Sequence, residues 1–322
     1  MPTLKEIKGR IASVKSTLKI TSAMKLVASA KLRKAQKAIE AMRPYEEQLQ
    51  RMLTAVGGGT TLETAKSLEN VSSGTKMPDF VRLGPENASS GTKMPDFVRL
   101  EGERPMAIIA VASNSSLCGG FNAAAIAKVR SVRRRGDVVY SIGRKMADAM
   151  RKDGFPSPED YTALAEHPAY APAAELVENL SKEVDEGRLA GVVLVYNHFV
   201  STAKQEPVVE ELISVRKGDA FSGASAFSLA EEKASPSDAS EIIIEPSRKE
   251  LLAALLPKTL KLKFYSALLD SAAAEHAART VAMQTATDNG ENLLAELTLQ
   301  YNKGRQQKIT SEILDLAGGQ QD

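Results

Sequence analysis

The first 42 residues carry an apolar repeat that strongly restricts the folds open to this chain. Its positions alternate in steps of three and four residues, and ten of the twelve are apolar. They are Leu4, Ile7, Ile11, Val14, Leu18, Thr21, Lys25, Ala28, Leu32, Ala35, Ile39 and Met42. A 3.5-residue period sustained in this way is typical of a coiled-coil seam and not of an ordinary globular helix. The segment is therefore predicted to be one helix of a coiled coil.

This predicted helix is too long to lie inside one domain. Pro44 is expected to kink it, but the apolar pattern resumes in YEEQLQRMLTAV (45–56) and stops at the three glycines 57–59. At 1.5 Å per residue, about 55 residues give a rod of about 80 Å. Part of the helix must therefore extend beyond any compact domain.

The carboxy-terminal stretch predicts a second long helix. Pro246 can start it, Pro257 is expected to interrupt or restart it, and Gly290 costs only about 1 kcal/mol relative to alanine. Its apolar residues do not fill one face: small ones gather at 272–278, and later leucines spread around the axis. A helix that is apolar on more than one side must contact more than one partner. The amino-terminal helix accounts for only one of them.

Between the two helices the pattern alternates between strands and helices. Predicted strands are MAIIAVA (106–112), DVVYSIG (137–143), GVVLVYNHF (191–199) and PVVEELISV (207–215), and predicted helices are 121–131, RKMADAMRK (144–152) and 173–187. Such alternation predicts a largely parallel sheet with helices on its faces. The predicted fold class is thus α/β with a long α-helical coiled coil, in which antiparallel amino- and carboxy-terminal helices flank a Rossmann-like α/β domain.

We divide the chain into five segments on this basis. They are an amino-terminal coiled-coil helix (1–56), an insert (57–104), the α/β domain (105–216), a flexible loop or strand (217–244) and a carboxy-terminal coiled-coil helix (245–322). The insert holds a duplication, because ENVSSGTKMPDFVRL (69–83) recurs as ENASSGTKMPDFVRL (86–100). Two copies of a 17-residue unit are too few for a solenoid, and we assign them no chemistry.

Charge and composition narrow the class of protein. Twelve Lys and Arg against four Glu give residues 1–51 a net charge of +8, although the whole chain carries only +2. Such a helix suits an acidic partner, or simply a solvated face. The single cysteine excludes an internal disulfide and suits a reducing compartment. With no signal peptide and no apolar run of about 20 residues, we expect a soluble intracellular chain.

The turn LCGGFN (117–122) is the most suggestive candidate for an active site, since it joins a strand to a helix. Its adjacent Gly119 and Gly120 do not make a dinucleotide fingerprint, and the chain has no Walker A string. Cys118 as a nucleophile would need a base, and the three histidines are distant in sequence. We therefore predict a small buried residue beside glycines that permit close packing.

Other kinds of site find equally little support. No cluster such as H-E-x-x-H offers a metal site, and no G-x-S-x-G elbow is present. Catalytic residues, cofactor and metal are accordingly predicted to be absent. Two alternatives stay open on the residues alone: a nucleotide-dependent Rossmann-type enzyme with coiled-coil extensions, and a coiled-coil scaffold or nucleic-acid adaptor.

Three stretches resemble the gamma subunit of the F-type ATP synthase. They are LKEIKGRIASVKSTLKITSAMKLVASAKLRKAQ (4–36), SNSSLCGGFN (113–122) and RTVAMQTATDNGENLLAELTLQYNKGRQQKITSEILDL (279–316). The polar residues that the family has before LCGG are partly replaced by serine here. With the α/β pattern between them, these stretches cover most of the chain; the duplicated segment and residues 218–240 depart from the family.

The resemblance implies a rotor shaft with no chemistry of its own. In the family, the terminal helices wind as an antiparallel coiled coil through a hexamer of alpha and beta subunits, and the α/β domain lies against the epsilon subunit and the membrane-embedded c-ring. Ion-driven rotation of the shaft then drives ATP synthesis at the beta subunits. Implied with this are an indirect, peripheral association with the cytoplasmic face of a bacterial inner membrane and no nucleic-acid partner.

The resemblance also implies contact residues for the hexamer. Arg305, Gln306 and Thr310 match the family's contact with a catch loop of the beta subunit, although they could otherwise be ordinary polar surface. Two further pairs, Met24 with Lys25 and Glu275 with Arg279, match positions near the shaft's interface with beta and its coupling region. For Met24, simple packing in the seam is the alternative.

Overall fold

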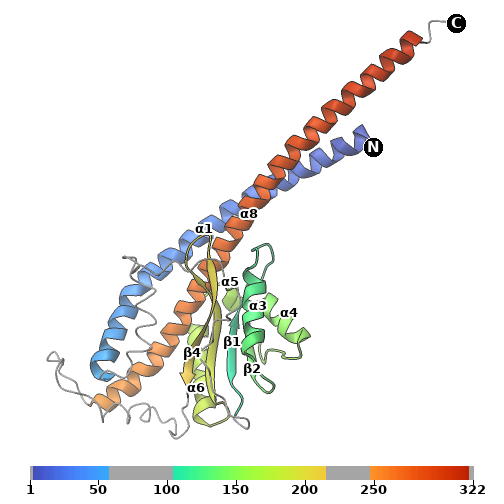
Figure 1. The fold of residues 1–322 in the computed structure, drawn as a ribbon. Coiled ribbons are helices and arrows are strands. Elements are labelled where there is room, and N and C mark those ends of the chain that lie inside the picture. Colours follow the sequence, from blue (N-terminus) through green and yellow to red (C-terminus); the bar gives the residue numbers. More distant parts are fainter. Residues whose placement is uncertain (1–2, 58–103, 215–246, 319–322) are drawn as a thin grey trace, which may run out of the picture.

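The structure is a computed structural model of the 322-residue chain, and it describes residues 3–57, 104–214 and 247–318. Two long helices, α1 (Leu4–Gly57) and α8 (Arg248–Gly318), carry a small α/β domain on one side (Figure 1). The predicted fold class is confirmed. The duplicated segment and the loop 218–240 lie outside the described residues.

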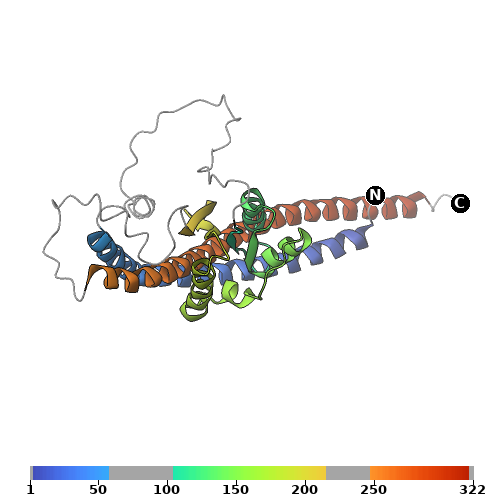
Figure 2. The ribbon, with the colours of Figure 1, turned by 90° about the horizontal axis from the view of Figure 1, so that it is seen from below.

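The two long helices run antiparallel and pack along each other, with both chain termini at the same end of the molecule (Figures 1 and 2). Arg248 donates from Nε to the carbonyl of Val56 at one end, and Leu4 lies beside Gly304 at the other. Each member of the predicted seam is buried or half-buried, Lys25 included. The 3.5-residue repeat therefore identified the α1 face that contacts α8.

Neither proline breaks its helix, contrary to the expectation for Pro257. Pro44 lies inside α1 and Pro257 inside α8. A proline leaves the carbonyl four residues earlier without its helical donor. Here those carbonyls belong to Glu40 and Ala253, and both residues lie on the exposed side of their helix. The cost of an interior proline is reduced at such positions, and packing against the other helix offsets the rest.

The sheet has four strands in the order β2-β1-β3-β4. β1 (Ala107–Val111) pairs in parallel with β2 (Val138–Ile142) and with β3 (Gly191–Phe199). β4 (Gln205–Ser214) returns antiparallel to β3, with an irregularity between Val192 and Val193. The sheet is therefore largely parallel, as predicted, and the strand bounds differ from the prediction by at most two residues.

Helices cover both faces of the sheet. On one face lie α3 (Phe121–Val132) and α4 (Arg144–Lys152), and on the other lie α5 (Thr162–Glu166), α6 (Tyr170–Asp185) and part of α8. The short α5 was missed by the sequence pattern. Alternate β3 residues serve the two cores: Leu194 faces α8, and Val195 faces α3.

The α8 helix therefore belongs to both halves of the molecule. Phe264 and Leu268 are nearly fully buried in the domain core, together with β-strand residues such as Leu194. Ala273 and Ala277, a little further along, pack with Leu32 of α1. This arrangement supplies the second contact surface that the spread of apolar residues in the sequence required.

Candidate functional site

The exposed tip of α8 carries three of the predicted contact residues. α8 continues past the start of α1, and all described side chains from Arg305 to Leu314 are exposed (Figure 1). Within it, the Thr310 hydroxyl donates to the carbonyl of Gln306 at 3.0 Å. The tip is therefore a single helix that offers its whole circumference to a partner.

These three residues share a face with exposed apolar side chains. At about 100° per residue, the rows 305-309-313 and 306-310-314 lie next to each other and span about half of the circumference. Ile313 and Leu314 are 59% and 64% exposed, which is unusual for such large apolar residues. The face thus combines Arg305, Gln306 and Thr310 with an apolar surface that nothing in the described chain covers.

Met24 and Lys25 lie far from this tip, in the helix interface. Both are half-buried, and Lys25 donates from Nζ to Oε1 of Gln284 on α8. Gln284 precedes Thr310 by 26 residues, or about 39 Å along a helix. The predicted contact residues are therefore not one cluster. The half-buried position of Met24 fits the alternative of seam packing that was given for this residue, and its contact with a beta subunit stays a prediction.

Glu275 and Arg279 form a buried ion pair below that level. Their side chains are 10% and 11% exposed, and Nη1 of Arg279 lies 2.7 Å from Oε1 of Glu275. From its other nitrogen, Nη2, Arg279 also donates to the Ser115 hydroxyl at 2.8 Å. The pair therefore joins α8 to the loop that follows β1, instead of pointing outward from the shaft.

Burial and charge act on this pair in opposite directions. Burial raises the pKa of Glu275, whereas Arg279 and, more weakly, Lys31 of α1 lower it. The carboxylate depends on those cations, because an unpaired charge is costly where water is excluded. Arg279 is accordingly a positioning residue for the loop, held in place by Glu275.

One side of the LCGGFN turn packs against the shaft, while Gly119 and Gly120 on the other side are exposed. The turn lies at the carboxyl end of β1, where the strand order changes direction and where doubly wound folds bind ligands. Here Cys118 and Phe121 pack with Ala274 and Ala278 of α8. A Cβ on Gly119, whose φ is +58°, would lie 3.9 Å from the Ala282 methyl. The shaft helix thus covers the buried side of the turn.

Cys118 has the structural role that the sequence predicted. It is 1% exposed, and Asn122 donates from Nδ2 to its sulfur at 3.1 Å. Asn122 also accepts from the backbone of Ser113 at 3.0 Å. The thiol is a packed member of a small polar network that shapes the turn.

A second polar contact fastens the sheet to the shaft. His198, near the end of β3, lies with Nδ1 2.5 Å from Oδ2 of Asp270 on α8, and the Phe199 amide donates to Oδ1 at 3.2 Å. Asp270, hydrogen-bonded to the ring, raises the pKa of His198; burial opposes this, and Glu210 and Glu206 of β4 add to it. The histidine favours its charged form at this junction.

The His198–Asp270 contact predicts a pH-dependent stability. Since the pKa of His198 is higher in the folded chain, its contribution is complete below the unfolded value of about 6.5 and is lost as pH rises through the folded value. His198→Gln should therefore cost about 1–2 kcal/mol at pH 6 and progressively less toward pH 9. Urea unfolding of both full-length proteins across this range measures it. A cost that grew with pH would contradict the assignment.

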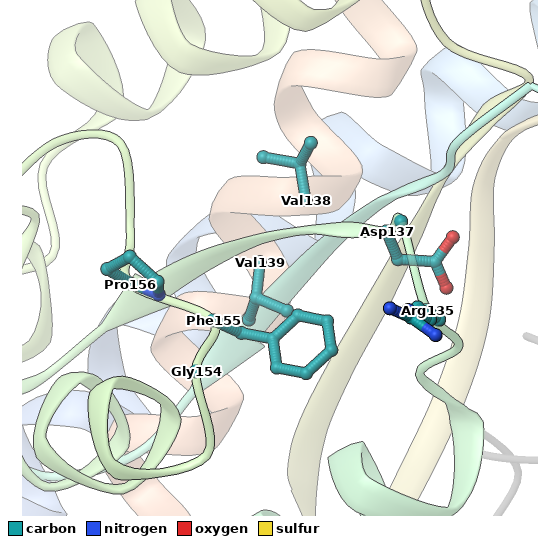
Figure 3. Close-up of a pocket in the computed structure, with 8 residues that line it drawn as sticks. Arg135, Asp137, Val138, Val139, Gly154, Phe155 and Pro156 are labelled. Atoms are coloured by element: carbon teal, nitrogen blue, oxygen red, sulfur yellow. The ribbon is translucent and has the colours of Figure 1, made fainter.

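A shallow pocket of about 510 Å³ lies elsewhere, at the amino end of β2 (Figure 3). Phe155 and Val139 form its apolar part, and Arg135 and Asp137 lie at its side. The Asp137 carboxylate is already engaged, because it accepts from the amides of Met106 at 3.1 Å and Arg134 at 2.9 Å. This hollow is at the opposite end of the strands from the ligand position of such folds, and it supports no catalytic site.

One set of surface residues was missed in the sequence. Ile20, Leu26 and Val27 of α1 are 57–69% exposed. They lie outside the seam, at positions that the 3.5-residue repeat assigns to solvent. Large apolar residues at such positions were the signal in the sequence that could have identified this surface. They extend the exposed apolar surface from the tip down along the coiled coil.

The described residues contain neither a membrane-spanning helix nor a metal-binding group. None of the helices in these ranges is long and apolar enough to cross a membrane. Among the same residues, histidine, cysteine, aspartate and glutamate side chains form no group that could hold a metal ion.

Known proteins similar to this chain share its architecture. Residues 3–321 match the family described as ATP synthase. The ATP synthase gamma chain of Phocaeicola vulgatus is 42% identical, and that of Flavobacterium johnsoniae 34% identical, with at least 98% of each chain covered. Among solved structures, a chain of the Euglena gracilis mitochondrial ATP synthase in its OSCP/F1/c-ring assembly has a TM-score of 0.64 at 17% identity, covering 98% of this chain and 93% of its own.

These similarities run through both long helices and the domain between them. A second Euglena structure, of the rotor, has a TM-score of 0.59 at 17% identity and covers 95% of this chain and 99% of its own. At 17% identity, the TM-scores of the solved structures establish the shared fold alone. Family membership is established by the 34–42% identity to bacterial gamma chains over nearly the full length. The chain belongs to the ATP synthase gamma-chain family.

Proposed function

We propose that this chain is the central rotor shaft of an F-type ATP synthase, which couples ion-driven rotation of a c-ring to ATP synthesis or hydrolysis at the beta subunits. The observation that carries the proposal is a coiled coil that leaves its α/β domain and ends in an exposed single helix, in a chain related over its full length to gamma chains. The chain acts as a non-catalytic subunit of that assembly.

The exposed coiled coil is the part that we place inside the hexamer of alpha and beta subunits. Arg305, Gln306 and Thr310 contact a beta subunit in this proposal, and the exposed Ile313 and Leu314 extend that contact. Large exposed apolar residues along a helix are favoured where a partner covers them. The excess of basic residues in α1 suits acidic surfaces of the surrounding sleeve.

The opposite end of the molecule is the foot in this proposal. Here the α/β domain, the last turns of α1 and the first turns of α8 lie together (Figure 1). We place this end against the epsilon subunit and the c-ring. The chain would then associate with the membrane indirectly, on the cytoplasmic face of a bacterial inner membrane.

The alternative of a nucleotide-dependent enzyme loses its support at the end of β1. That alternative requires an open crevice where the strand order reverses. Ala274, Ala278 and Ala282 of α8 lie against the turn there, and Arg279 holds the Ser115 side chain. The packed side of the turn is therefore covered by the shaft helix, and its exposed side, with Gly119 and Gly120, carries no dinucleotide fingerprint.

Co-expression with alpha and beta subunits tests the proposal. We expect native mass spectrometry to give one copy of this chain with three alpha and three beta subunits, because one asymmetric shaft serves three catalytic sites in the family. The complex should hydrolyse ATP, and alpha and beta expressed without this chain serve as the control. A free monomer beside inactive partners would exclude the rotor function.

A further inference from the structure

The distal half of the coiled coil contains two contacts of a leucine with a glycine. A Cβ placed on Gly290 would lie 2.7 Å from Cδ2 of Leu18, and one placed on Gly304 would lie 3.2 Å from Cδ2 of Leu4. Leu4 and Leu18 are 14 residues apart, as are Gly290 and Gly304, which is two heptads on each helix. Each leucine thus packs against a glycine, where even a methyl group would require the leucine side chain to move.

A polar layer lies directly below these contacts. The Thr287 hydroxyl is 3.0 Å from the Thr21 hydroxyl, and Thr21 is 8% exposed. Next to this pair Lys25 donates to Gln284, which in turn donates to Asp288 at 2.6 Å. Each threonine hydroxyl also lies near a carbonyl of its own helix, Leu18 for Thr21 at 3.1 Å and Met283 for Thr287 at 2.9 Å. The polar layer therefore matches the observed register and adds to it a direct hydrogen bond between the helices.

An apolar seam by itself does not fix the axial position of two helices. Because the repeat is seven residues long, a slip of one heptad again places apolar residues opposite apolar residues. In the observed register Leu18 faces Gly290. A slip of seven residues would bring it opposite Leu297 in one direction or Met283 in the other, and both are large and buried. In either slipped register Leu18 would meet a large side chain in place of the glycine, and the close approach of the helices at this point would be lost.

We propose that the Leu18–Gly290 and Leu4–Gly304 contacts, with the Thr21–Thr287 hydrogen bond, form a register lock between α1 and α8. The lock determines how far the α8 tip extends past α1 and how the tip faces are oriented. One consequence of the lock rests on the proposed rotor function: the tip would meet its partner at a fixed distance along the shaft axis. The lock itself is a property of the chain alone.

Spin labels on the full-length chain test the lock. Lys15 of α1 and Glu296 of α8 are both exposed and can be replaced by labelled cysteines, while Cys118 is buried. The parent protein should give one distance between the labels. Gly290→Leu should displace or split that distribution, because a slip of one heptad moves a helix by about 10 Å. Leu18→Ala in the same chain should restore the parent distance, since it vacates the space that the new leucine needs.

Gly9→Leu is the matched control. Gly9 lies in α1 with no atom within 4 Å of its Cβ position, so the same substitution there should leave the distance unchanged. An unchanged distance in Gly290→Leu would overturn the lock, as would a displacement that Leu18→Ala did not reverse. If Gly290→Leu fails to fold, Gly290→Val with and without Leu18→Ala gives the same test with a smaller side chain. Assembly with alpha and beta is measured separately, so failure of the rotor function would appear there and not in the label distances.

Discussion

Arg279→Met should destabilise the chain by about 3–5 kcal/mol, the range for removing one partner of a buried ion pair. The substitution keeps much of the side-chain volume but leaves the buried Glu275 carboxylate without the cation that lies 2.7 Å away. It also removes the hydrogen bond to Ser115, and with it a tie between α8 and the LCGGFN turn. Urea unfolding of the full-length chain measures the loss.

The effect of Arg279→Met should depend on pH in a defined direction. Burial already raises the pKa of Glu275, and loss of Arg279 removes its strongest opposing influence. The folded variant then retains a proton that the unfolded chain releases above about pH 4.3, so its stability falls as pH rises through the folded pKa. The variant should therefore be closer to the parent at pH 5 than at pH 8.

Glu275→Gln combined with Arg279→Met is the control for this assignment. Removing both charges leaves no uncompensated ion, and the double variant should recover most of the lost stability. Hydrogen exchange of residues 113–122 in the assembled complex separates the loss of the ion pair from the loss of the hydrogen bond to Ser115. The double variant still lacks that hydrogen bond, so its loop should exchange faster than in the parent. A double variant as unstable as Arg279→Met would show that the ion pair is not the cause.

The sequence predicted most of the fold because its strongest signals are local. The 3.5-residue repeat from Leu4 to Met42 identified the buried face of α1, and the alternation of apolar strands with helices identified the α/β domain. Continuation of α8 through Pro257 could not be predicted in the same way. It depends on whether Ala253 lies on the exposed side of the helix, and that is a property of the packed structure.

The candidate site was predictable only in part. The exposed group at the tip, Arg305, Gln306 and Thr310, was found from its resemblance to the family, and it lies on one exposed face. The same resemblance included Glu275 and Arg279, which the structure places inside the molecule. A sequence motif records that a residue matters, but it does not distinguish a residue that contacts a partner from one that holds a neighbouring loop.

Ending the chain after Gly304 should leave its fold and its assembly with alpha and beta intact, but lower ion-driven ATP synthesis by about tenfold or more, a loss of about 1.4 kcal/mol. The described side chains from Arg305 to Leu314 are all exposed, so their removal breaks no contact of the core. What is lost is the single-helix tip with its mixed polar and apolar face. ATP synthesis by the reconstituted enzyme in sealed vesicles, measured beside the amount of assembled complex, gives the result.

Point variants decide whether the face, and not merely the length, of the tip matters. Replacing Arg305, Gln306 and Thr310 together by alanine should reproduce much of the loss, because a few central polar and apolar residues carry most of the binding energy of an interface. Lys308→Ala with Glu312→Ala is the matched control: these two residues form an exposed pair at 3.7 Å, off that face of the helix. Equal losses in both sets would show that the tip acts only through its helical length, and synthesis at the parent rate after truncation would remove the tip from the coupling mechanism.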